Sequence, residues 1–174
     1  MTSPEVSTRD RLLDAFETLL VEHGPRATTL EAVAGHAGVS KGGLLYHFAS
    51  KEDLVEGTLE RLLAMVQQDV ERMRTSPDGA VQYYLATSVS TGSDLDRALV
   101  AATRLAQENS DRVAAALAEV RDSWLAVLRA ELGDESLART IQLIGDGLYF
   151  NDAFGMADPA ALGHVQEVLG RLGR

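Results

Sequence analysis

The sequence contains no cysteine, only four prolines and few aromatic residues (5%). Without cysteine the chain has no thiol nucleophile, no disulfide and no thiolate ligand, so cysteine enzymes and zinc fingers are excluded. Apolar runs are also short: nowhere do about 18 consecutive apolar residues occur, and the first residues lack the apolar core of a signal sequence. We therefore expect a cytoplasmic protein without a membrane partner.

Positive charge is scarce as well. The 174 residues include 16 Lys and Arg against 26 Asp and Glu, a formal net charge of −10, which disfavours general adhesion to nucleic acid because phosphates are repelled. The only two lysines, Lys41 and Lys51, stand close together in "GVSKGGLLYHFASKEDL", residues 38–54. At physiological salt the Debye length is about 8 Å, so local cations act on DNA in contact while distant acids are screened.

The pattern that is present is helical, since strand-like alternation is nearly absent. Apolar residues between Thr8 and His23 recur at helical spacing, and Gly24 and Pro25 end that helix. Further breaks such as "TSPDG", "STGSD" and "ADP" divide the rest of the chain. We expect an all-α protein with helices at about 8–23, 29–37, 41–48, 50–74, 79–91, 94–107, 110–132, 134–155 and 158–172.

Capping residues mark the starts of the early helices. Thr28 with Glu31 is a capping box that predicts a helix from residue 29, and Ser40 is the predicted N-cap of the third helix. Ser50 with Asp53 forms a second capping box that opens the long fourth helix. Three short helices therefore precede residue 50.

The second and third of these helices have the spacing of a helix-turn-helix. Ala34 is small where two helices cross, Gly38 can adopt positive φ in the turn, and Val39 and Leu44 can lock the pair together. On a helical wheel, Leu44 and Leu45 share the inward face with Phe48. The opposite face carries Gly42, Gly43, Tyr46 and His47.

That outward face suits the major groove of DNA. The two glycines have no side chain that would separate the helix from the base edges, while Tyr46 and His47 can donate or accept hydrogen bonds. Hydroxyls, helix N-termini and cations surround it and are predicted to hold phosphates: Thr28, Thr29, Ser40, Lys41 and Lys51. The alternative is a structural helical hairpin whose glycines only shorten the helix.

Residues 8–54 resemble the N-terminal DNA-binding domain of TetR-family transcriptional regulators. The resemblance rests on "HG" after the first helix, on "TTLEAVAGHAGVS" for the second helix and turn, and on "SKEDL" leading into the fourth. It implies a recognition helix at 41–48 and phosphate contacts from Thr28, Thr29, Tyr46, His47 and Lys51. This sequence departs from the family pattern at Leu45, where many members have tyrosine, and at Pro25, where many have an aromatic residue.

The resemblance further implies two parts, a helix-turn-helix DNA-binding domain at 1–53 and a helical ligand-binding and dimerisation domain at 54–174. It implies a one-component regulator, a repressor, that binds a palindromic operator as a homodimer and is released by a small molecule. Helices 134–155 and 158–172 are the candidates for the dimer interface, because their glycines and apolar residues favour close helix contacts.

One stretch of the second half, "IQLIGDGLYFNDAFG" at 141–155, places two acids in an apolar run. A buried carboxylate needs compensation, which a cation or a hydrogen-bonding ligand can supply, and the faces of aromatic rings attract cations. We therefore expect a small-molecule effector that is cationic or aromatic. The predicted ligand-binding residues are Tyr83, Trp124, Asp146, Tyr149, Phe150 and Asp152, with Tyr84 and Phe154 as further lining. In the alternative interpretation the acids face solvent or cap helices, and the aromatic residues are core.

An enzyme is not expected. No His-Glu-x-x-His or Glu-x-x-His spacing and no glycine-rich phosphate loop occurs, so we predict no catalytic residues, no metal and no cofactor. Two other classes stay open at this point: a helical ligand-binding module without specific DNA function, and a small helical enzyme.

Overall fold

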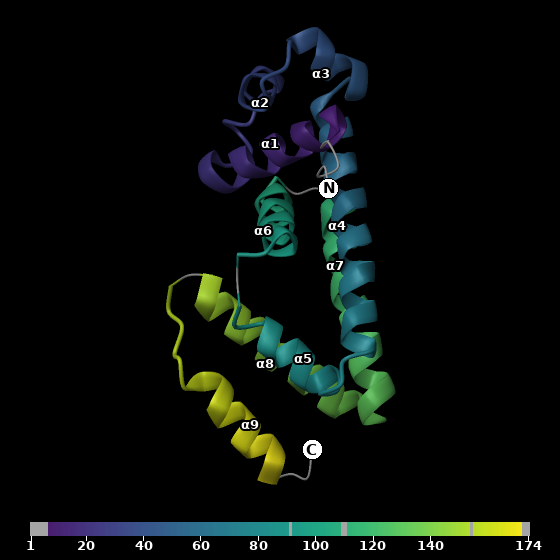
Figure 1. Ribbon diagram of the computed structural model, residues 1–174, viewed down its shortest axis with the longest axis vertical. Helices are drawn as coiled ribbons and strands as arrows, with labels where there is room; N and C mark the ends of the chain where they lie inside the picture. The colour runs from purple at the N-terminus through teal and green to yellow at the C-terminus, as the bar shows by residue number, and fades with distance from the viewer. Residues whose placement is uncertain (1–6, 91, 109–110, 154, 172–174) are drawn as a thin grey trace, which may run out of the picture. The chain divides into compact units, whose positions relative to one another are not determined.

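The computed structural model describes residues 7–90, 92–108, 111–153 and 155–171, which form nine α-helices and no strand (Figure 1). The all-α prediction is confirmed. None of the described helices combines the length and the apolar character that crossing a bilayer requires. The helices are α1 (Thr8–His23), α2 (Leu30–Ala37), α3 (Lys41–His47), α4 (Lys51–Arg74), α5 (Ala80–Thr87), α6 (Asp94–Ala106), α7 (Asp111–Leu132), α8 (Glu135–Ala153) and α9 (Ala161–Arg171).

The helix ends follow the predicted ones within a few residues, and two differences have local causes. α5 ends at Thr87 rather than residue 91; the hydroxyls of Thr87 and Ser88 donate to carbonyls one turn earlier, and bonds of this kind slightly destabilise a helix. α9 begins at Ala161 rather than 158, because the side chain of Asp158 accepts from the amide of Ala160 and forms a turn there.

The chain divides into two compact units. Unit 1 comprises Met1–Met65 and Ser93–Glu119, and unit 2 comprises Val66–Gly92 and Val120–Arg174. Two helices, α4 and α7, therefore contribute residues to both units. The predicted functional division at residues 53 and 54 stays a prediction.

Unit 1 is built around α1. Its apolar stripe, which includes Leu12, Phe16 and Leu20, is fully buried. α1 packs against both α2 and α6, and Figure 1 shows α6 on the other side of α1 from α2 and α3. Gly57 lets α4 lie close to this core, because it has no side chain. A Cβ at this position would lie only 3.0 Å from a ring carbon of Phe48. The end of α3 is thereby held against α4.

Unit 2 contains a close crossing of α5 and α8. Gly145 of α8 lies against Tyr84 of α5, and a Cβ at this position would lie 2.3 Å from the tyrosine ring. The N-terminus of α5 follows Gly79, which offers no capping side chain. Glu131 of α7 takes that role, since its carboxylate accepts from the amides of Ala80 and Val81.

Candidate nucleic-acid interface

The turn between α2 and α3 has the geometry of a helix-turn-helix. Gly38 ends α2 in the left-handed conformation (φ 67°), and the amide of Val39 donates to the carbonyl of Ala34 over 3.0 Å. Ser40 then caps α3: its hydroxyl oxygen accepts from the amide of Gly43 over 3.1 Å. The predicted turn and the predicted N-cap are both confirmed.

The two faces of α3 differ sharply in exposure. Leu44 and Phe48 are buried (0% and 3% exposed), whereas Tyr46 is 86% exposed. The prediction for Leu45 is wrong, because this side chain is 40% exposed. With about 100° between successive residues, a seven-residue helix buries a narrow stripe, and Leu45 lies at its margin.

The outward face is bare at one end and aromatic at the other. A Cβ on Gly42 would meet only Ser40 Oγ, at 4.0 Å, so this position is open. A Cβ on Gly43 would lie 3.3 Å from the same oxygen, within the cap. One turn later the rings of Tyr46 and His47 meet edge to face, with centroids 5.2 Å apart. Hydrogen-bonding groups are thus presented beside an unobstructed stretch of helix.

The two threonines have different positions. Thr29 is exposed and is the N-cap of α2, accepting from the amide of Ala32 over 3.2 Å. Thr28, the predicted cap, is 1% exposed, and its hydroxyl donates to the carbonyl of Gly24 over 2.8 Å. Thr28 therefore stabilises the chain reversal after α1, and we leave its hydroxyl out of the phosphate contacts.

Both lysines are engaged within the protein. The Lys41 ammonium forms an ion pair with Glu31 of α2, and this hydrogen bond lowers the pKa of the Glu31 carboxyl. The Lys51 ammonium donates to the carbonyl of Pro25 over 2.7 Å, which ties the start of α4 to the turn after α1. To contact a phosphate as predicted, either lysine must therefore leave its present partner or share its ammonium group between that partner and the phosphate.

Two arginines of α1 also support this surface, and the sequence reasoning missed them. Arg11 donates to the carbonyl of Ala37 over 2.7 Å and so satisfies the C-terminus of α2. The guanidinium of Arg9 lies 5.4 Å from the centroid of the Phe48 ring. These contacts join residues far apart in the chain, so no local sequence pattern predicts them.

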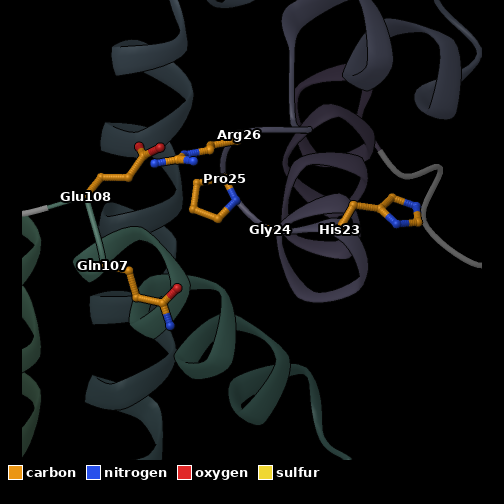
Figure 2. A pocket seen from close by; sticks show the side chains of 6 residues that line it. All are labelled: His23, Gly24, Pro25, Arg26, Gln107 and Glu108. Atoms are coloured by element: carbon orange, nitrogen blue, oxygen red, sulfur yellow. The ribbon is translucent and has the colours of Figure 1, made fainter.

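A cavity of about 490 Å³ lies beside the turn after α1 (Figure 2). Arg26 and Glu108 extend toward each other at this cavity. None of the predicted effector residues contributes to it. Its lining consists of His23, Gly24, Pro25, Arg26, Gln107 and Glu108.

In unit 2 the structure brings together two of the predicted ligand-binding residues. Tyr83 donates its hydroxyl to one oxygen of Asp69 over 2.7 Å, and the indole nitrogen of Trp124 donates to the other over 3.0 Å. Asp69 is 8% exposed, and Arg72 lies 3.4 Å from it. Sequence reasoning missed Asp69, because a single acid in a charged helix resembles any solvated surface residue.

Asp146 has a cation within the protein. Arg121 lies 2.8 Å from one carboxylate oxygen, and the hydroxyl of Tyr84 donates to the other over 3.2 Å. Burial and the negative charge of Asp146 raise the pKa of Tyr84 well above its ordinary range. The charge of Asp146 therefore does not require a cationic ligand.

The other predicted ligand residues follow Asp146 along α8. Tyr149 and Asp152 are partly buried, and Phe150 is 53% exposed. Phe154 lies outside the described residues. No group of three or more His, Asp or Glu side chains in the described part of the chain is arranged to hold a metal ion.

Comparison with known proteins covers both parts of the chain. Residues 12–58 match the family described as bacterial regulatory proteins, tetR family. Residues 78–174 match the family described as tetracyclin repressor-like, C-terminal domain. The two matches together span the helix-turn-helix and most of the remaining helices.

Individual relatives agree with these matches. The chain is 31% identical over 152 residues to the HTH-type transcriptional repressor KstR2 of Rhodococcus jostii, across 82% of this chain and 74% of that protein. The repressor of the same name from Mycolicibacterium smegmatis is 41% identical over 61 residues, 35% of this chain and 30% of the relative. A solved TetR-family structure from Streptomyces coelicolor A3 has a TM-score of 0.75 at 22% identity, over 96% of this chain and 98% of that one, and so shares the fold.

Proposed function

Because the chain belongs to the TetR family of bacterial regulatory proteins, we propose that it is a repressor whose α3 reads a palindromic operator in the major groove. It acts as a homodimer, with one α3 for each half-site, and a small molecule releases it from DNA. Such a protein works in the cytoplasm, where the bacterial chromosome lies.

The observation that carries this proposal is the division of α3 into a buried and an open face. Leu44 and Phe48 anchor the helix, while Gly42 and Tyr46 stand outward with nothing packed over them beyond the Tyr46–His47 ring contact. A helix held in this way can insert its exposed face into a groove without losing its packing. Thr29, Ser40, Lys41 and Lys51 are the proposed phosphate contacts around it.

Selection of binding sites from a pool of random duplexes, with the full-length protein, tests this function. We expect enrichment of an inverted repeat, and protection of the same repeat when promoter DNA is footprinted. Tyr46→Ala should weaken binding to the selected duplex by about 1–3 kcal/mol. Its free energy of unfolding should stay within about 0.5 kcal/mol of the wild type, because the side chain is exposed. Failure to enrich any sequence would reject the repressor proposal.

The proposed dimer surface is the exposed apolar face of the C-terminal helices. Leu143 is 64% exposed, Phe150 lies two turns later on the same face of α8 and is 53% exposed, and Val168 of α9 is 53% exposed. Gly147 lies between the first two, and a Cβ there would meet nothing within 4 Å, so this face is open to a second helix. Leu143→Asp should shift the protein from dimer to monomer in sedimentation at micromolar concentration.

The proposed effector site is in unit 2, beside Tyr83 and Trp124, where two aromatic side chains converge on the carboxylate of Asp69. Asp146, Tyr149 and Asp152 extend the candidate site along α8, whereas Phe150 belongs to the proposed dimer surface. The effector is a cationic or aromatic compound. Trp124 is the only tryptophan of the chain, so its fluorescence reports binding directly. A compound that quenches this fluorescence and releases the selected duplex would identify the chemical class of the effector. We propose that α4, which has residues in both units, couples effector binding to DNA binding.

A further inference from the structure

Exposed apolar side chains are unevenly distributed over the described residues. Six large ones are strongly exposed, and four of these lie in or after α8. The remaining two are adjacent on the short helix α3: Leu45 (40% exposed) and Tyr46 (86% exposed). A single exposed leucine on a protein surface is ordinary. Leu45, however, stands next to Tyr46, the most exposed aromatic residue of the proposed reading helix. This position indicates that its side chain contacts a bound molecule.

The surroundings of Leu45 leave it accessible. One turn before it on α3 stands Gly42, where even an added Cβ would meet only Ser40 Oγ at 4.0 Å. The neighbouring Lys41 is held by its ion pair with Glu31 of α2. Lys41, Gly42, Leu45 and Tyr46 thus form one strip along the helix, with the apolar side chain of Leu45 one turn after the lysine.

We propose that Leu45 contacts the C5-methyl group of a thymine, and so selects a T·A pair at one position of each operator half-site. This inference rests on the proposed function. Among the groups that distinguish the base pairs in the major groove, this methyl group is the apolar one, and the others are hydrogen-bond donors and acceptors. A leucine side chain can satisfy none of those polar groups, and it would remove water from any that it covered. The thymine methyl is therefore the one feature of the groove that gains from contact with Leu45.

Replacement of thymidine by deoxyuridine tests the contact, because it removes only the methyl group. The probe is the duplex selected from the random pool, with deoxyuridine at each thymidine position in turn, symmetrically in both half-sites. For the wild type, one position should show a loss of affinity of about fourfold per methyl group removed. Leu45→Ala should weaken binding to the thymine duplex and lose this sensitivity, whereas Leu45→Met, which keeps an apolar side chain of similar volume, should retain it.

The control is Met156→Ala, which removes another exposed apolar side chain (56% exposed) from a segment without a proposed contact. It should keep both the affinity and the sensitivity to deoxyuridine. If deoxyuridine changes nothing at any position, or if Leu45→Ala keeps the wild-type sensitivity, the proposal for Leu45 is wrong while the repressor function stands. If no duplex is selected at all, the repressor function and the role of Leu45 are both rejected.

Discussion

Glu17 of α1 and Arg61 of α4 form a buried ion pair, with 2.6 Å between Oε1 of the carboxylate and Nη2 of the guanidinium. The Glu17 side chain is 1% exposed and that of Arg61 is 15% exposed. Arg61 also reaches Asp14 over 2.7 Å, and Arg97 of α6 lies 3.9 Å from the second oxygen of Glu17. One carboxylate thus connects three helices of unit 1.

Loss of the arginine should be costly. In Arg61→Ala the buried Glu17 keeps only the more distant Arg97, and removal of one partner from a buried pair destabilises by about 3–5 kcal/mol. Adding Glu17→Gln should recover part of this loss, because the remaining group is neutral. Urea unfolding at fixed protein concentration measures both variants. A double variant that is no more stable than Arg61→Ala would show that Arg61 acts through Asp14 or through packing instead.

The same carboxyl group should give the stability a distinctive pH dependence. Burial raises the pKa of Glu17 above its ordinary value of 4.5, since the charged form loses its hydration, and Arg61 only partly offsets this effect. A folded-state pKa above the unfolded one means that the stabilising contribution is complete below pH 4.5 and declines as the pH rises through the raised value. Glu17→Gln should therefore gain stability relative to the wild type between pH 4.5 and pH 7. Parallel unfolding curves with a constant difference across this range would contradict the raised pKa.

The crossing of α5 and α8 should depend on the absence of a side chain at residue 145. In Gly145→Ala the new Cβ would lie 2.3 Å from the Tyr84 ring and 2.9 Å from Ser88 Oγ, so the helices must separate, at a cost of about 1–3 kcal/mol or more. Gly35→Ala is the matched control within a helix: its Cβ meets nothing within 4 Å, and better helix propensity should stabilise by up to about 1 kcal/mol. Equal thermal stability of the two variants would show that the crossing adjusts freely.

The helix-turn-helix could be predicted from the sequence because its signals are local. The reciprocal hydrogen bonds of Ser50 and Asp53, at 3.0 Å and 3.1 Å, are those that a capping box implies, in which the two side chains are three positions apart. Gly38 adopts the positive φ that the turn was expected to need. Each of these groups is satisfied by a neighbour within a few residues, so the spacing alone contains the information.

The prediction for Thr28 was wrong although its partner is local. Its hydroxyl is buried and donates to the carbonyl of Gly24, four residues earlier, so Thr29 caps α2 instead. The acids that the sequence reasoning missed depend on contacts distant in the chain. Glu17 resembles a surface acid in the sequence, yet its partner Arg61 is 44 residues away. Asp69 likewise becomes part of a polar cluster only when α5 and α7 bring their aromatic side chains to it. No helical periodicity contains that information.

The ion pair between Lys41 and Glu31 should limit the affinity for DNA. Glu31 occupies the ammonium that a phosphate would otherwise bind, and it places a negative charge beside the proposed groove contact. Glu31→Gln should therefore tighten binding to the selected duplex, by up to about fivefold at low salt. Lys41→Ala should weaken binding and flatten the dependence of log K on log salt by about 0.9 per subunit. In the Lys41→Ala background most of the gain from Glu31→Gln should disappear, because no ammonium remains to be released. An equal gain in both backgrounds would mean that Glu31 acts only by repelling phosphates and that Lys41 does not contact them.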